Sequence, residues 1–254
     1  MPEVIRTPDV SNELSFTDKF VGILSSPGET FQTIVGTEPK TSNWALPLVL
    51  TMIVGIIFTL VVFTQPAIQE QMSEAQFKAM QQRVADGKMT QEQMDTAVEK
   101  NPAKPGSPMF LIFGGIGVVI VMSFALFAYS GVYFLIGKVA YKSAIPYTKV
   151  LEVNGLGLFV AAIVALLSMV MIVAMGSLYA TLSPALLVSN FDPTNKQHKL
   201  LAALNILEFW NMYVVGVGLS KVWNTSLGKS LGAVGGVWIV WTLVKVFANF
   251  GFGS

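Results

Sequence analysis

The chain has 254 residues, of which 53% are hydrophobic and only 12% are charged, with a formal net charge of +1. Because an ordinary soluble domain is about 25% charged, this composition excludes a typical soluble protein and indicates a membrane protein. The small net charge, without a basic block, argues against nucleic acid as a partner. The absence of cysteine excludes disulfides, thiol catalysis and cysteine-bound metals.

Residues 1–43 predict a cytoplasmic amphipathic arm, without the continuous apolar core of a cleavable signal peptide. Its first apolar residues recur at roughly helical spacing: Leu14, Phe16, Phe20, Ile23 and Leu24. A second helix is predicted at SSPGETFQTI, with Ser26 as the N-cap and Pro27 as the first helical residue. Such helices lie in the membrane interface, apolar face down. Two roles stay open for the arm: it could cover the cytoplasmic ends of the spans, or it could recruit a partner. The candidate contact residues are Phe16, Phe20 and Phe31.

Five apolar runs are long enough to cross a bilayer, since a span needs about 20 apolar residues. They cover residues 44–63, 109–136, 153–175, 200–219 and 231–250. The third run continues to residue 188, which is too long for one crossing. Gly176 and Pro184 indicate that the span ends near residue 175 and that a short helix or interfacial segment follows. The sequence therefore predicts an all-α, polytopic membrane helix bundle of about five spans.

The connections between the spans differ in charge. Residues 137–150 and 220–230 carry lysines and no acid, whereas the 64–108 connection mixes lysines with acids. The positive-inside rule places the two acid-free loops in the cytoplasm. The N-terminus is then cytoplasmic and the C-terminus extracytoplasmic, in a multi-pass protein of the inner (plasma) membrane whose first partner is the lipid bilayer.

Residues 64–108 predict a small extracytoplasmic helical hairpin, inserted into a five-span domain of residues 44–254. Two capping-box patterns begin its helices: Ser73 with Gln76, and Thr90 with Gln93. The turn between them falls at Asp86-Gly87. We interpret its apolar seam as packing, with methionine as filler, rather than as a copper site of soft ligands. The seam residues are Met72, Phe77, Met80, Val84, Met89, Met94 and Val98.

Glu208 is the most unusual residue of the predicted fourth span, because it lies near the middle of the 200–219 run. An acid there costs about 2.5 to 3.5 kcal/mol on insertion scales. Asn205 and Asn211 lie three positions to either side, on one broad helical face. Two interpretations stay open: a glutamate that hydrogen-bonds the helices together, and a proton or cation site. Lys245 in the fifth span is a candidate partner, although snorkelling to the interface explains it more simply.

Glu152 and Asn154 are predicted to open the third span, where an acid suits the helix dipole. A two-carboxylate cation site with Glu208 stays open as the alternative. We expect no cofactor and assign no metal site, since His198 is the only histidine and lies in a loop. Gly232 to Gly236 completes a GxxxG pattern, which permits either internal packing or a homo-oligomer.

Several stretches carry a resemblance to a known family. They are SPGETFQTI, NWALPLVL, IGKVAYKSAIPYTKV, LNILEFWNMYVVGVGLSKVWNTSLGKS and VWIVWTLVK, in this order from about residue 15 to 245. The chain resembles the bacterial branch of the Yip1 domain family. The resemblance implies five spans with the N-terminus in the cytoplasm. Eukaryotic members bind Rab-type GTPases through a longer region with a DLYGP-type motif, which is absent here, so Rab binding is not carried over. The LEVNG start of span three departs from the family pattern.

Three functions are compatible with these features. The leading hypothesis is a non-enzymatic membrane protein that organises membrane or recruits protein partners through the arm, the acid-free loops and the hairpin. The alternative is a small transporter or channel with a cation or proton path along the polar residues of span four. A lipid-modifying enzyme is disfavoured, because the sequence offers no recognisable nucleophile–base set.

Overall fold

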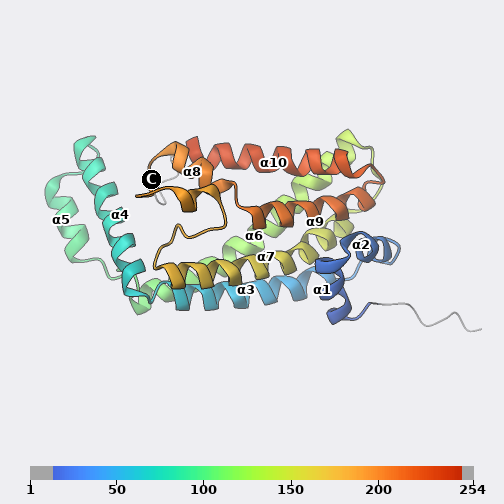
Figure 1. The fold of residues 1–254 in the computed structure, drawn as a ribbon, viewed down its shortest axis with the longest axis horizontal. Helices are drawn as coiled ribbons and strands as arrows, with labels where there is room; N and C mark the ends of the chain where they lie inside the picture. Colours follow the sequence, from blue (N-terminus) through green and yellow to red (C-terminus); the bar gives the residue numbers. More distant parts are fainter. Residues whose placement is uncertain (1–13, 248–254) are drawn as a thin grey trace, which may run out of the picture.

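The computed structural model describes residues 14–247, and all regular secondary structure in this part of the chain is helical, with turns and loops between the helices. The elements are α1 (Phe16–Ser25), α2 (Pro27–Val35), α3 (Ser42–Val62), α4 (Pro66–Ala85), α5 (Gln91–Glu99), α6 (Pro108–Ala140), α7 (Tyr147–Met175), the 3-10 helix η1 (Pro184–Leu187), α8 (Lys196–Ala203), α9 (Ile206–Val222) and α10 (Leu227–Phe247). The prediction of an all-α helix bundle is confirmed. Figure 1 shows the long helices lying side by side along one axis.

Four helices are long and apolar enough to cross a membrane, namely α3, α6, α7 and α10. A fifth crossing is formed if α8 and α9, which are bent by 52° at a short break, count as one span. The α1–α2 pair lies at one end of the bundle and α4 with α5 at the other (Figure 1). Helix α10 ends at the side of the bundle opposite the arm, as an odd number of crossings requires (Figure 1).

The predicted fourth span, 200–219, is corrected by the structure because it is not one straight helix. Helix α8 ends at Ala203, and α9 begins after Asn205, whose side-chain oxygen accepts a hydrogen bond from the Leu207 N–H at 3.0 Å. The Ile206 N–H bonds the Leu182 carbonyl at 3.0 Å. These bonds satisfy backbone groups that the break would otherwise leave without partners.

The third span also differs from the prediction at its start. Helix α7 begins at Tyr147, so Glu152 and Asn154 lie inside it instead of opening it. Its predicted end at residue 175 is confirmed, where Gly176 takes a left-handed conformation (φ +60°) as the helix C-cap. The short helix expected around Pro184 is η1. Of the predicted fifth span, residues 248–250 lie outside the described residues, as do residues 1–13 of the arm.

The 64–108 connection contains two helices that project beyond the ends of the spans (Figure 1). The capping box at Thr90 and Gln93 is present and begins α5. The one predicted at Ser73 is not used, because α4 already begins at Pro66, the favoured type of residue for a first helical position. The predicted apolar seam closes only in part, since Met94 is buried while Phe77 remains 42% exposed.

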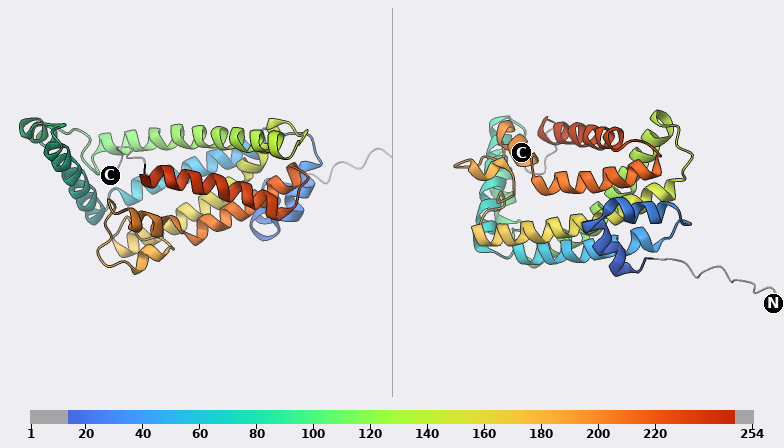
Figure 2. Two further views of the ribbon diagram at one scale, coloured as in Figure 1. Left: turned by 90° about the horizontal axis from the view of Figure 1, so that it is seen from above. Right: turned by 45° about the vertical axis from the view of Figure 1, so that its right-hand side comes forward.

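The apolar side of the arm packs against the spans, as expected if the arm covers their ends, and does not simply lie on the lipid interface. Ile23, Phe31 and Ile34 are all at most 3% exposed and belong to one cluster with Val153 of α7 and Val214 of α9. Figure 2 shows the two arm helices lying against the end of the bundle, where α1 contacts α7 and α2 contacts α9. The arm therefore covers the ends of two spans.

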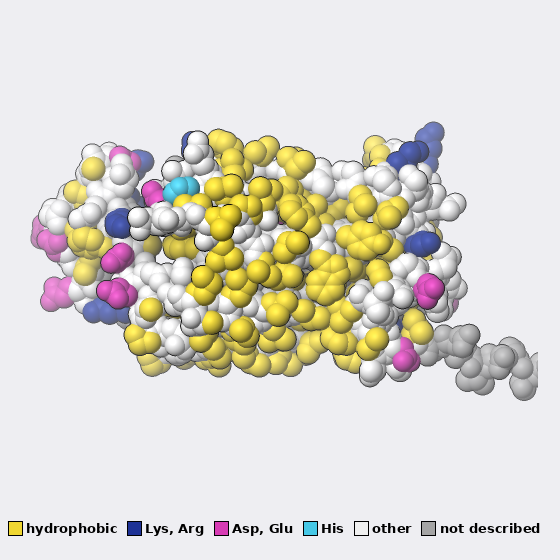
Figure 3. All heavy atoms as spheres, in the orientation of Figure 1, with side chains coloured by type: hydrophobic (Ala, Val, Ile, Leu, Met, Phe, Trp, Pro, Cys, Tyr) yellow, Lys and Arg dark blue, Asp and Glu magenta, His cyan; other side chains and the backbone are white. Residues whose placement is uncertain are grey.

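The outer surface divides into an apolar middle and two polar ends. Figure 3 shows hydrophobic side chains over the middle of the molecule and charged side chains at both ends. Helix α6 contributes strongly, with Phe124 at 73% and Val121 at 64% exposure. An apolar surface of this kind is what a bilayer requires of the helices that it surrounds. The chain is thus a multi-pass membrane protein.

Candidate functional site

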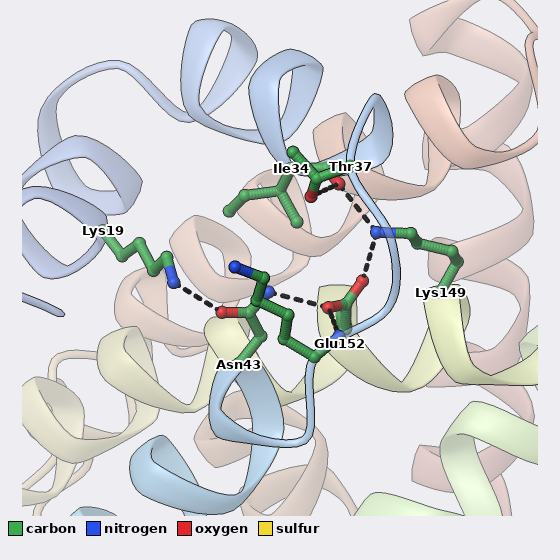
Figure 4. Close-up of polar contacts among 7 residues, drawn as sticks. Lys19, Ile34, Thr37, Asn43, Lys149 and Glu152 are labelled. Atoms are coloured by element: carbon green, nitrogen blue, oxygen red, sulfur yellow. Dashed lines mark hydrogen bonds and ion pairs between the residues drawn. The ribbon is translucent and has the colours of Figure 1, made fainter. Parts of the chain in front are cut away.

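The most distinctive polar feature of the described chain is a buried ion pair on α7. Lys149 Nζ and Glu152 Oε2 lie 2.7 Å apart, and their side chains are only 5% and 1% exposed (Figure 4). A separation of three residues places both side chains on one helical face. A buried charge is costly unless it is paired and hydrogen-bonded. The other hydrogen bonds of these two side chains therefore determine how the pair affects stability.

Glu152 reaches the segment that joins the arm to α3. Its second oxygen, Oε1, accepts hydrogen bonds from the backbone N–H of Lys40 at 2.6 Å and from the Asn43 side-chain amide at 2.7 Å. Lys40 lies just before α3, and Asn43 is in its first turn. One carboxylate of α7 therefore holds the connection between the arm and the first span.

Lys149 reaches the arm itself. Its ammonium group donates a hydrogen bond to the backbone carbonyl of Ile34 at 2.8 Å, in the last turn of α2. Carbonyl groups in the last turn of a helix lack intrahelical partners and carry partial negative charge, so a cation is well placed there. The Thr37 hydroxyl bonds the same carbonyl at 2.9 Å.

Lys19 extends this network to α1. Its ammonium group donates to Asn43 Oδ1 at 2.7 Å, while the Nδ2 of the same amide donates to Glu152 (Figure 4). We call the set of Lys19, Lys40, Asn43, Lys149 and Glu152, with the Ile34 carbonyl, the arm clamp. It connects α1, α2, α3 and α7 through one buried carboxylate.

Glycines allow the helices that carry the clamp to pack closely. Gly155, one turn after Glu152, faces the backbone of Trp44 in α3 so closely that a Cβ would collide with it. Gly218 of α9 lies under the ring of Phe31, where a Cβ would come within 3.0 Å of the ring atoms. Small residues of this kind let helices approach more closely than larger side chains permit.

Asn154 and Glu152, the polar residues predicted at the start of span three, do not form a cation site together with Glu208. Asn154 donates to the Ser130 hydroxyl of α6 at 3.1 Å and to the Val150 carbonyl at 3.3 Å. This amide therefore ties α7 to α6. Glu152 belongs to the arm clamp, with Lys149 as its counter-ion, and does not join Glu208.

The three polar residues of the predicted fourth span have different neighbours. Asn205 is the buried N-cap of α9. Glu208 is exposed in the first turn and accepts a 3.3 Å hydrogen bond from the Trp238 indole of α10. Asn211 turns its oxygen toward Gly157 of α7, and this buried atom has no hydrogen-bond donor. The expected continuous polar face is thus divided among a cap, α10 and α7.

The sequence did not identify four members of the clamp: Lys19, Lys40, Asn43 and Lys149. The Lys149–Glu152 spacing was the available signal, because a base and an acid three residues apart on a helix can neutralise each other. The backbone N–H of Lys40 carries no signal in its residue type. Within residues 14–247, no group of three or more His, Asp or Glu side chains is arranged to hold a metal ion.

The arm rings lie beside the clamp. Phe16 and Phe20 both meet Phe159 of α7 edge-on, with ring centroids 5.3 and 5.1 Å apart. A cavity of about 110 Å³ opens here between α1, α3 and α7, with Lys19 and Asn43 among its lining residues. Aromatic edge-to-face pairs contribute about 0.5 to 1.5 kcal/mol each beyond burial, so the rings and the clamp act together to seat α1.

Comparison with known families decides the classification. The model of the Yip1 domain family matches residues 21–248. The chain belongs to the Yip1 domain family. The match begins inside α1 and includes the Lys149–Glu152 pair of this Yip1-domain protein. The family consists of membrane proteins and is not known as enzymatic. No curated protein and no solved structure matches the chain.

Proposed function

We propose that this Yip1-domain protein is a non-enzymatic membrane protein that recruits protein partners to the bilayer through its arm. One observation carries the proposal: the arm clamp fixes α1 and α2 to the spans and leaves their polar side outward. A surface that is held before a partner arrives loses less conformational freedom on binding than a mobile one does. The exposed residues of α1 and α2 are Phe16, Thr17, Asp18, Val21, Ser25, Glu29, Gln32 and Thr33.

We also propose a location and an orientation for the protein from the charge of its turns. We assign the arm end to the cytoplasm of an inner (plasma) membrane, because the two acid-free turns, 137–150 and 220–230, lie at that end. The α4–α5 pair then forms an extracytoplasmic hairpin, inserted within the five-span domain of residues 44–254. In this arrangement the arm, predicted as residues 1–43, lies on the cytoplasmic side, where cytosolic proteins can bind it.

The test compares two pairs of substitutions at opposite ends of the protein. Val21→Arg with Gln32→Arg changes the exposed side of the arm, and Phe77→Arg with Gln81→Arg makes the matched change on α4. Proteins cross-linked to the chain in its native membrane are identified by mass spectrometry. We expect the arm variant to lose partners that the α4 variant keeps. Identical partners in both variants would refute recruitment through the arm.

Phe16→Asp with Phe20→Asp is a separate variant with a different meaning. Both rings pack on Phe159, so these changes unseat α1, and the change at Phe16 also alters its outer surface because that side chain is 44% exposed. Loss of partners in this variant as well as in the Val21 and Gln32 variant supports a seated arm as the recruiting surface. Retention in both variants counts against any role of the arm in recruitment.

A second candidate function, a cation or proton path, is favoured by one observation. Glu208 lies beside the break in the fourth span and meets Trp238 near the middle of α10. Interrupted helices at this depth are common where transporters bind their ions. Flux measured in proteoliposomes that is present in the wild type and lost in Glu208→Gln would establish this function. We expect no flux in either protein.

A further inference from the structure

The turns after α6 and α9 are joined into one corner at the arm end. The ring of Tyr141 stacks on Trp223 with centroids 5.0 Å apart and planes inclined by 21°. The Tyr141 hydroxyl donates to the Lys229 carbonyl at 3.0 Å. The Ser143 hydroxyl donates to the Val222 carbonyl at 3.3 Å. Two turns that are far apart in sequence therefore form one fixed surface.

This corner presents lysines without acids. Lys138 is in the last turn of α6 and Lys142 lies just after that helix. Lys221 is in the last turn of α9 and Lys229 in the first turn of α10. Three of the four are exposed, and Lys221 is half-buried. No ion pair in residues 14–247 involves any of them. Figure 3 shows Lys and Arg side chains gathered at this end of the molecule. We call these four residues the lysine corner.

The lysine corner adjoins the apolar surface of the spans. In the last turns of α6, Leu135 is 60% exposed and Val139 80% exposed. Lys138 lies between them in the sequence and places its ammonium group 5.2 Å from the ring centroid of Phe134. Tyr and Trp side chains are enriched at the level of the lipid headgroups. The corner thus combines cations with a lipid-facing apolar surface directly beneath them.

We propose that the lysine corner binds the headgroup of an anionic phospholipid, whose acyl chains lie on the adjoining surface of α6. A phosphodiester supplies the negative charge that the corner lacks, and Lys ammonium groups bind phosphate as point charges. Each lysine near an anionic surface contributes about fivefold in affinity. The exposed apolar residues beside the cations favour a lipid over a soluble phosphate. This inference does not depend on the proposed recruiting function of the arm.

The test measures lipid selectivity on the full-length protein. The detergent-solubilised chain is mixed with equal amounts of phosphatidylglycerol and phosphatidylcholine, and retained lipid is counted by native mass spectrometry. We compare wild type with the triple variant Lys138→Gln, Lys142→Gln and Lys229→Gln. The matched control removes three exposed lysines at the opposite end: Lys78→Gln, Lys88→Gln and Lys100→Gln.

We expect wild type and control to prefer phosphatidylglycerol and the corner variant to lose about tenfold or more of that preference. Equal preference in all three proteins, or an equal loss in both variants, would overturn the proposal. Displacement of phosphatidylglycerol by an equal concentration of inorganic phosphate would also overturn it, by making a soluble anion the ligand. If the corner variant has a lower melting temperature than wild type in phosphatidylcholine, its loss of preference could reflect lost stability, and the salt dependence of the wild type then decides the test. Its preference must fall as NaCl rises from about 0.1 to 1 M.

Discussion

Glu152 shows how a single residue can connect separate parts of this protein. Its carboxylate accepts bonds from Lys40 and Asn43 and pairs with Lys149, so each oxygen has partners. A buried ion pair gives little net stability compared with a well-packed apolar pair, but breaking it by removing one member is strongly destabilising. We therefore assign the clamp a role in fixing where the arm sits.

Substitution of one clamp member gives the first prediction. Glu152→Gln leaves the Lys149 ammonium buried without its counter-ion, so we expect the free energy of unfolding to fall by about 3 to 5 kcal/mol. The double change Lys149→Met with Glu152→Gln removes both charges and keeps an amide oxygen for the Lys40 N–H and the Asn43 amide, so it should recover most of this loss. Both are measured by denaturant titration in detergent. A single variant as stable as wild type would contradict the assignment.

Asp18 gives a pH-dependent prediction at the same scale. The Ser15 hydroxyl donates to its carboxylate at 2.6 Å and the Ser15 N–H at 3.1 Å, and these bonds hold the pKa of Asp18 below its ordinary value of 3.8. The capping contribution to α1 is therefore complete above pH 3.8 and is lost as the pH falls through the lower, folded value. Ser15→Ala should raise the pKa of Asp18 toward 3.8, as read from its carboxyl NMR signal. An unchanged titration curve would contradict this cause.

At the scale of elements, the contact between α3 and α7 depends on Gly155. A Cβ at this position collides with the Trp44 backbone, which cannot yield as a side chain would. We expect Gly155→Ala to lower the free energy of unfolding by about 1 to 3 kcal/mol, the usual cost of overpacking. Gly236→Ala is the matched control, because a Cβ there meets nothing within 4 Å. Equal stability of the two variants would mean that α3 and α7 can separate without cost.

The elements also show what the sequence could predict. Long apolar runs identified the existence of the spans, and the Thr90 and Gln93 pattern identified the start of α5. The start of α7 was missed because Lys149 and Glu152 are charged in sequence yet neutralise each other in the fold. The break before α9 was missed because one of its hydrogen bonds, from the Ile206 N–H to the Leu182 carbonyl, joins residues that are distant in sequence. Residues whose role depends on a distant partner carry little local signal.

At the scale of the whole molecule, the two polar ends must face opposite sides of a membrane. The chain has no cysteine, so single cysteines can report the side. We expect Ala144→Cys, in the turn after α6, to react with an impermeant thiol reagent from the cytoplasmic side only. Ser73→Cys, on α4, should react only from the other side. Labelling of both from one side would contradict an odd number of spans between them.

The measurement that tests the central claim is hydrogen exchange of the arm amides in full-length protein in lipid nanodiscs. If the clamp holds the arm to the spans, α1 and α2 are protected in the wild type and exchange faster in Glu152→Gln, while α3, α6 and α10 keep their protection. Lys88→Gln, on the α4–α5 side, serves as the control and should leave the arm protected. Arm amides that exchange at the same rate in wild type and in Glu152→Gln would show that the clamp does not hold the arm.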